Sequence, residues 1–283
     1  MDAVCHPFFL HSDAGALFAV HHRPAAGRAV RGQVLCVAPF NEEMNRCRSM
    51  VTLQAEAWAR QGFGTLLVDL HGTGDSAGDH ADARWARWKA DIALALQWLA
   101  EQPGAHRVLW GIRLGALLAT EIHAAWARPQ VGLLLWQPVA DGKTHLTQFL
   151  RVKIAAQMDR IDLPKETTAG MRAKLAAGQC VEVGGYALHP EFTAALDRAR
   201  LAEHRPPAGT QVLWLEHAAA GQTEPSPATV QLMGRWPGAD VHLQTRLFEG
   251  PAFWQVHERM VAPEAIRLSS EWLAALHPDE APA

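Results

Sequence analysis

The chain has 283 residues, of which 49% are hydrophobic, and a formal net charge of −3. This length and apolar content suffice for a large core and suit a single α/β domain with an insertion. The near-neutral charge, with a pI of about 6.6, gives no electrostatic basis for binding nucleic acid or an acidic membrane surface. We therefore expect no nucleic-acid partner.

The four cysteines, Cys5, Cys36, Cys47 and Cys180, are widely separated. Without a C-x-x-C pair, neither a zinc site nor a disulfide framework is indicated, and reduced thiols favour the cytoplasm. The 15 histidines are dispersed, so we expect no metal and no other cofactor. We find no basic start followed by a long apolar stretch and no run of about 18 apolar residues, and therefore expect no signal peptide and no membrane span.

The first half of the chain predicts strands that alternate with helices. Strands are predicted at residues 8–10, 16–22, 33–38, 65–69, 106–110 and 131–136, and helices at 46–61, at 85–101 and from 116 onward. From about residue 33 to 136 the alternation is regular, so successive strands need crossover connections. That order predicts a parallel sheet with helices on both faces.

The stretch from 141 to 205 breaks this rhythm. It contains helix-like segments at 146–158 and 190–203 and a glycine-rich piece, Val183-Gly184-Gly185. We interpret residues 141–205 as a cap inserted over the sheet, and 1–140 with 206–283 as the core. The core pattern resumes with strands at 210–215 and 241–248 and helices at 227–236 and 263–276.

The most informative segment is Gly111-Ile112-Arg113-Leu114-Gly115, which follows a predicted strand and opens a helix of small residues. It resembles the nucleophile elbow of the α/β-hydrolase superfamily, G-x-S-x-G. The segment from Asp69 to Ser76 resembles the D-x-x-G-x-G-x-S loop of the same superfamily. The resemblance implies an α/β-hydrolase fold, with a mostly parallel central sheet, helices on both faces and a helical cap.

A narrower resemblance rests on three segments, 39–46, 69–78 and 110–119. They look like the exosortase A system-associated hydrolase 2 proteins, a family that accompanies bacterial exopolysaccharide and protein-sorting loci. Its members are named hydrolases through their superfamily, so the name itself says little about activity.

Arg113 stands where the superfamily has its nucleophile, and a guanidinium cannot act as one. The resemblance places the oxyanion-hole amides at Leu114 and near Phe40, and these backbone donors would survive a change from Ser to Arg. Two interpretations of Arg113 stay open. It pairs internally with Glu42 or Glu43, or it binds a carboxylate or phosphate together with the helix N-terminus.

The other triad positions also depart from the superfamily pattern. Glu224 lies in a G-x-x-E segment that resembles the acid loop, and Glu216 is a second candidate. Phe253 or Trp254 stands where the histidine is expected, and His257 follows a few residues late. A joint loss of the serine and the histidine is chemically consistent. The histidine serves as the general base that takes the proton of the serine, and it has no such task once the serine is absent.

Three functions follow from these residues. The first is a degenerate or atypical hydrolase that binds an anionic or acyl small molecule. The second is an active ester or thioester hydrolase with a non-serine nucleophile, either Cys47 at a helix start or a water activated by Glu224 and His257. The third is a non-catalytic interaction protein that uses the apolar side chains of the cap, Phe149, Ile154 and Met158.

Overall fold

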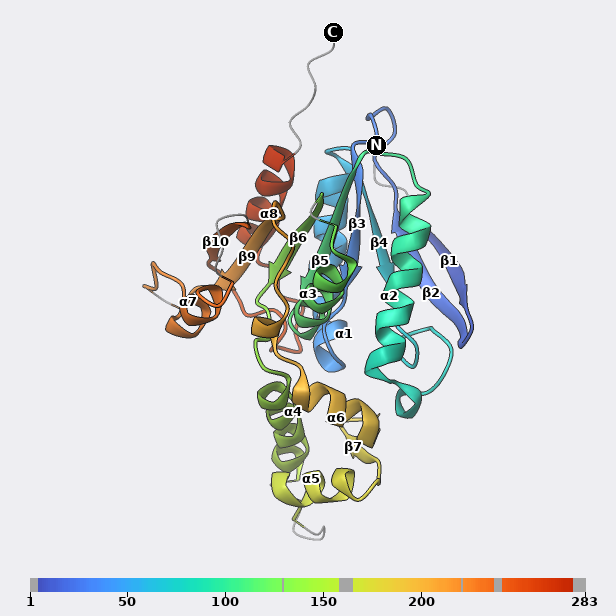
Figure 1. Ribbon diagram of the computed structural model, residues 1–283, viewed down its shortest axis with the longest axis vertical. Helices are drawn as coiled ribbons and strands as arrows, with labels where there is room; N and C mark the ends of the chain where they lie inside the picture. Colours follow the sequence, from blue (N-terminus) through green and yellow to red (C-terminus); the bar gives the residue numbers. More distant parts are fainter. Residues whose placement is uncertain (1–4, 129, 158–164, 220, 237–240, 277–283) are drawn as a thin grey trace.

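The computed structural model describes residues 5–128, 130–157, 165–219, 221–236 and 241–276 (Figure 1). These residues form a main sheet of eight strands in the order β1-β2-β4-β3-β5-β6-β9-β10. The strands are β1 (Cys5–Ser12), β2 (Gly15–His22), β3 (Gly32–Val37), β4 (Phe63–Val68), β5 (His106–Ile112), β6 (Val131–Trp136), β9 (Gln211–His217) and β10 (His242–Phe248). β2 pairs antiparallel with both β1 and β4, and every other pairing is parallel. The predicted, mostly parallel α/β architecture is confirmed.

Helices cover both faces of the sheet, because the central strands are buried on both sides. The helices of the core are α1 (Glu42–Ala59), α2 (Trp85–Ala100), α3 (Leu114–Trp126), α7 (Pro227–Met233) and α8 (Pro263–Leu276). α1 and α8 share one apolar cluster with the sheet, in which Trp58 and Trp272 are buried. α2 and α3 belong to the cluster on the opposite face, with Trp88 and Leu117.

The segment between β6 and β9 forms a body of its own beyond one end of the sheet (Figure 1). It comprises α4 (Gly142–Ala156), α5 (Thr168–Ala176), β7 (Val181–Val183), β8 (Tyr186–Leu188), α6 (Pro190–Arg198) and the 3-10 helix η2 (Leu201–Glu203), and we call it the α4–η2 insertion. The glycine-rich piece predicted here forms the turn of the β7–β8 hairpin. Met158 lies outside the described residues.

The two ends of the α4–η2 insertion are joined to each other. The amide of Gly142 donates to the Ala199 carbonyl at 3.0 Å, and the amide of Leu201 donates to the Ala140 carbonyl at 3.0 Å. An ion pair between Arg200 Nε and Asp141 Oδ2, at 2.8 Å, lies beside them. This pairing ends the helix predicted at 190–203 at residue 198, because Ala199 must be extended, with φ −69° and ψ 125°, to reach its partner.

Two helix starts differ from the predictions. α1 begins at Glu42 rather than at residue 46, because Asn41, with φ 52° and ψ −125°, turns the chain directly from β3 into the helix. α3 begins at Leu114, directly after Arg113. Among the described residues, none of the helices combines the length and the apolar character that crossing a bilayer requires.

Candidate functional site

The turn between β5 and α3 places Arg113 at the end of a central strand. Its φ of 55° and ψ of −118° are unfavourable for a residue with a side chain. The flanking glycines allow the tight turn: a Cβ on Gly115 would overlap the carbonyl oxygens of Val37 and Ala38, and one on Gly111 would lie 2.7 Å from the Ala116 nitrogen. Strand and helix therefore approach each other as closely as in a nucleophile elbow.

Backbone strain is concentrated in three neighbouring loops. Asn41 follows β3 with φ 52°, and Gln137 follows β6 with φ 42°. β3 and β6 are the two strands that pair with β5, so these residues flank Arg113 at the same edge of the sheet. Strained non-glycine residues gather at functional sites when the surrounding contacts hold them in place.

The guanidinium of Arg113 is held by the protein itself. Its Nε lies 3.2 Å from Glu43 Oε1 and its Nη2 3.1 Å from the same oxygen, so the two groups donate to one carboxylate. Nη1 donates to the Gln137 carbonyl at 3.3 Å. The guanidinium carbon also lies 5.3 Å from the ring centroid of Trp254, a cation–π contact.

The structure thus brings Arg113 to Glu43 and not to Glu42. The Glu42 carboxylate instead accepts a hydrogen bond from the Tyr186 hydroxyl at 3.0 Å. The side chains of Arg113 and Glu43 are only 15% and 18% exposed. Burial raises the pKa of the Glu43 carboxyl, and the charge of Arg113 opposes that rise. Each of the two largely buried charges is therefore stabilised by the opposite charge of its partner.

The acid and histidine candidates lie away from the guanidinium. Glu224 is exposed, and Glu216 accepts hydrogen bonds from the Ser226 amide at 3.2 Å. His257 Nε2 lies 3.3 Å from Arg46 Nη2. Within the described part of the chain, none of these three side chains forms a hydrogen bond or ion pair with Arg113.

The Trp254 ring, which packs on Phe253, lies beside Arg113 instead. Phe253 and Trp254 are 1% and 3% exposed, and their ring centroids lie 5.0 Å apart. The Trp254 ring lies over the Arg113 guanidinium, and an indole ring cannot accept a proton as a histidine does.

The thiols of the core lie in surroundings that disfavour the thiolate form. Cys47 is fully buried, and burial raises its pKa well above the usual value for a thiol, with the Glu43 charge acting in the same direction. Burial also raises the pKa of Cys36. Nucleophilic cysteines require the thiolate form, so both groups have the character of core side chains.

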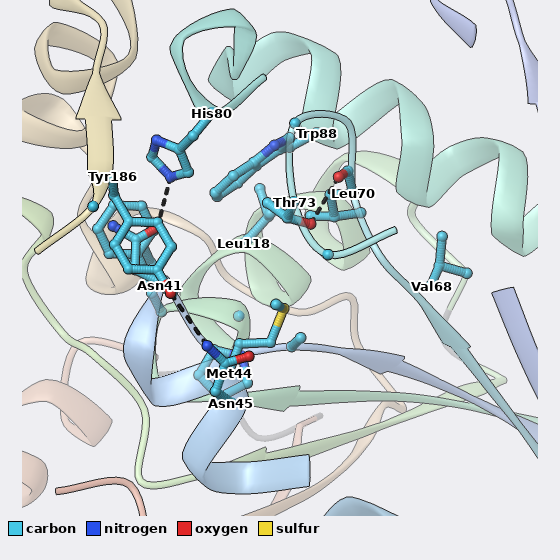
Figure 2. A pocket seen from close by; sticks show the side chains of 18 residues that line it. Asn41, Met44, Asn45, Val68, Leu70, Thr73, His80, Trp88, Leu118 and Tyr186 are labelled. Carbon is cyan, nitrogen blue, oxygen red and sulfur yellow. Dashed lines mark hydrogen bonds between the residues drawn. The ribbon is translucent and has the colours of Figure 1, made fainter. Parts of the chain in front are cut away.

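A pocket of about 260 Å³ opens beside the turn, and we call it the elbow pocket (Figure 2). Its wall is mostly apolar and draws on the loops after β3 and β4, the first turns of α1 and α3, and the β7–β8 hairpin. Its lining residues include Pro39, Phe40, Asn41, Met44, Asn45, Val68, Leu70, Thr73, His80, Trp88, Leu114, Gly115, Leu118, Gly185 and Tyr186. Both candidate oxyanion-hole residues, Phe40 and Leu114, are therefore at one pocket.

Two polar side chains that the sequence analysis did not single out tie the insertion to this pocket. His80 is in the 3-10 helix η1 (His80–Asp82). Its Nε2 atom lies 2.7 Å from Asn41 Oδ1, and its Nδ1 atom lies 2.8 Å from the Ala187 carbonyl oxygen. Tyr186 Oη accepts from Asn45 Nδ2 at 3.3 Å. Figure 2 shows His80 and Tyr186 together at one side of the pocket, so the β7–β8 hairpin forms part of its wall.

His145 is a third residue that the sequence analysis missed. It comes from α4, is 7% exposed, and has its ring centroid 6.0 Å from that of Phe40. Burial lowers its pKa to about 3, and the nearby charge of Arg113 acts in the same direction. His145 is therefore neutral at physiological pH. No local pattern distinguishes it from the other dispersed histidines.

The described residues contain no group of three or more His, Cys, Asp or Glu side chains that could hold a metal ion. The His80 ring is hydrogen-bonded to Asn41 and to the Ala187 carbonyl, and its centroid lies 5.2 Å from that of the Tyr186 ring. The arrangement offers hydrogen-bond donors and apolar surface to a ligand.

Comparison with known proteins identifies the family. Residues 28–174, just over half of the chain, match the family described as serine aminopeptidase, S33. The chain belongs to this family of α/β hydrolases. The superfamily resemblance seen in the sequence is thereby confirmed. No curated protein matches the sequence.

Solved structures of other α/β hydrolases are similar over nearly the whole chain. Est1E from Butyrivibrio proteoclasticus with bound ferulic acid is 15% identical, with a TM-score of 0.62 over 95% of this chain and 96% of that one. A carboxyl esterase from Bacillus coagulans in complex with glycerol is 14% identical, with a TM-score of 0.61 over 96% of this chain and 99% of that one. At such identities the similarity shows the fold.

The pair between Arg113 and Glu43 can be tested by removing one charge. We expect Glu43→Gln to lower the free energy of unfolding by about 1–3 kcal/mol, because it leaves a largely buried guanidinium without its counter-charge. Glu42→Gln is the matched control, since a glutamine oxygen can still accept from Tyr186, and we expect a change below about 0.5 kcal/mol. Urea unfolding measures both. Equal losses in the two variants would contradict the pairing.

The buried neutral His145 predicts a specific loss of stability in acid. Its pKa in the folded chain lies below the ordinary value of 6.5, so the unfolded chain binds the proton first. Stability should therefore fall as the pH drops below about 6.5 toward 3, by up to about 1.4 kcal/mol per pH unit. In unfolding curves recorded across this range, the slope of the free energy of unfolding against pH reports the number of protons taken up on unfolding. His145→Leu should lower that number by about one. Parallel pH profiles for the variant and the wild type would contradict this effect.

Proposed function

We propose that Arg113 replaces the nucleophilic serine and that the chain is a degenerate member of its family that binds a small anionic or acyl molecule. The supporting observation is the guanidinium at the strained turn, held by Glu43 and the Gln137 carbonyl and covered by Trp254. A guanidinium has five donors and no lone pair to attack with. The turn supports binding and bracing, and it offers no covalent chemistry of the serine type.

Two helix N-termini give the elbow pocket its affinity for a hydrogen-bond acceptor. α1 and α3 both begin at its wall, and the N-terminus of a helix carries a partial positive charge that favours an acceptor. The Leu114 amide and the loop at Phe40 are the oxyanion-hole positions that we propose. The Nδ2 atom of Asn41, a residue that is 4% exposed, is buried without a hydrogen-bond partner. These donors suit a carboxylate or an acyl carbonyl.

The rest of the pocket favours a ligand whose remaining part, beyond the carboxylate or acyl carbonyl, is apolar. Leu70, Trp88, Leu118 and Val68 contribute apolar side chains to its wall. The ferulic acid bound to Est1E is a small carboxylic acid with an aromatic ring, and it is a suitable probe for this chain. The ligand class that we propose is thus a small carboxylic acid or its acyl derivative.

The two alternative functions have less support. An active ester or thioester hydrolase would need another nucleophile, and burial raises the pKa of Cys47. Glu224 and His257 are not joined to the turn by any hydrogen bond in the described chain. An interaction protein would present the apolar side chains of the insertion outward, yet Leu146 and Leu150 are buried and Phe149 packs on Phe40 with centroids 5.2 Å apart.

We also propose that residues 141–205 act as the cap and that 1–140 with 206–283 form the core. The joined ends of the insertion at Asp141 and Arg200 support this division. His80 and Tyr186 link the insertion to the core beside the pocket, which supports a covering role over the ligand.

The association with exosortase and exopolysaccharide systems is likewise a proposal. The three segments that carry the resemblance, 39–46, 69–78 and 110–119, all contribute residues to the elbow pocket. The resemblance is therefore concentrated where a ligand would bind. Exosortase genes beside the gene for this chain would support the link, and the free cysteines, two of them exposed, are compatible with the proposed cytoplasmic location.

Assays with p-nitrophenyl esters test the loss of hydrolysis. We expect no turnover by the wild type above the protein-free rate, and none by Arg113→Ser, because Trp254 lies beside residue 113 and no described histidine is hydrogen-bonded to that residue. A fluorophosphonate probe should label neither protein. Ester hydrolysis by the wild type at about 1 s⁻¹ or faster, a usual enzymatic rate, would contradict the proposal.

Calorimetric titration with octanoate and ferulate tests binding. We expect Leu118→Phe, which fills the elbow pocket, to weaken binding at least tenfold. Val230→Phe adds similar bulk at a side chain that is 55% exposed on α7, and it should leave the affinity unchanged. Equal affinities in wild type and Leu118→Phe would place the ligand elsewhere.

A further inference from the structure

The elbow pocket has an apolar neighbour on the other side of Met44. This second pocket, of about 280 Å³, lies where α1 packs on β2 and β4, and we call it the α1-side pocket. Phe18, Val20, Val51 and Leu67 supply most of its apolar wall. The function proposed above does not use it.

The two pockets share a wall rather than lying apart. Ala38, Pro39, Met44 and Val68 line both of them. Ala38 and Pro39 contribute compact side chains, so the movable part of the wall is the Met44 thioether. Figure 2 shows this side chain extending from α1 into the elbow pocket. Methionine is unbranched and has three rotatable bonds, so it can vacate such a position at low cost.

We propose that the ligand is a long-chain acyl compound whose polar head lies at the α3 N-terminus and whose tail passes Met44 into the α1-side pocket. This inference rests on the proposed function and specifies its ligand. The volumes support a single occupant: at about 260 and 280 Å³, each pocket is below the range of about 300–1,000 Å³ usual for ligand sites, and together they are within it.

Charge sets the orientation of that ligand. The charged groups of the α1-side pocket are Arg48 and Asp69, which form an ion pair at 3.6 Å. Arg48 therefore already has a counter-charge, whereas the partial positive charge at the N-terminus of α3 favours an acceptor. A carboxylate or acyl carbonyl gains more at the elbow, and the apolar wall between Phe18 and Val51 suits the tail.

The test is the dependence of affinity on chain length. Titrating butyrate, octanoate, dodecanoate and hexadecanoate into the full chain should show affinity rising with each added methylene, up to about fourfold per group when it is fully buried. In Met44→Trp, which closes the passage, the rise with chain length should stop at the shorter acids. Met44→Ala should strengthen binding of the longest acid.

A second blocking variant excludes a purely local effect of Met44. Thr52→Trp fills the far end of the α1-side pocket and should weaken only the long acids, by at least tenfold. Val230→Trp on α7 is the matched control and should change nothing. Arg48→Gln should leave the affinity for the short acids within about twofold, and a tenfold loss of that affinity would overturn the proposed orientation.

The outcomes separate this inference from the proposed function. If short acids bind but added methylenes bring no gain, the two-pocket inference is wrong and the proposed function stands. The same conclusion follows if the gain survives both Met44→Trp and Thr52→Trp. If no acid of any length binds the wild type, both are contradicted.

Discussion

The ion pair between Arg113 and Glu43 is the interaction on which the site depends. Arg113 is on a strained turn after the central strand β5, and Glu43 is in the first turn of α1. The pair therefore joins the loops that follow two adjacent strands, β5 and β3. If the ion pair were broken, the guanidinium and the carboxylate would each be a largely buried charge without a partner, at a cost of several kcal/mol.

On the function that we propose, this arrangement explains how a hydrolase scaffold keeps its geometry with an arginine in place of the nucleophile. The close approach at Gly111 and Gly115 needs small residues and makes no demand on the side chain between them. An arginine is tolerated there because the carboxylate, the Gln137 carbonyl and the Trp254 ring surround it. α1 and α3 still begin beside the elbow pocket, and the partial positive charge of a helix N-terminus supports the acceptor site that we propose there.

Much of the architecture could be predicted from the sequence, because its signals are local. Buried strands are continuous apolar runs, and the segment from Gly111 to Gly115 specifies a tight turn by its glycines alone. The partner of Arg113 could be narrowed only to two adjacent residues. Neighbouring residues on a helix point in different directions, and the choice of Glu43 depends on where α1 begins, which the strained Asn41 determines.

The remaining site residues come from parts of the chain that have no such local signal. His80 is in a single 3-10 turn, and Tyr186 and His145 belong to the insertion, whose placement on the core depends on long-range contacts. Glu224 and His257 were suggested by their order along the chain. Order cannot show that one is exposed on a loop and the other lies against Arg46.

A crystal structure of the chain with bound dodecanoate tests the central claim most directly, because it shows both the ligand and the guanidinium. We expect the carboxylate at the amides of Leu114 and Phe40, with Arg113 still held by Glu43. A carboxylate bound by Arg113 in place of Glu43, or an acyl group attached covalently to a side chain, would contradict the braced, non-catalytic elbow.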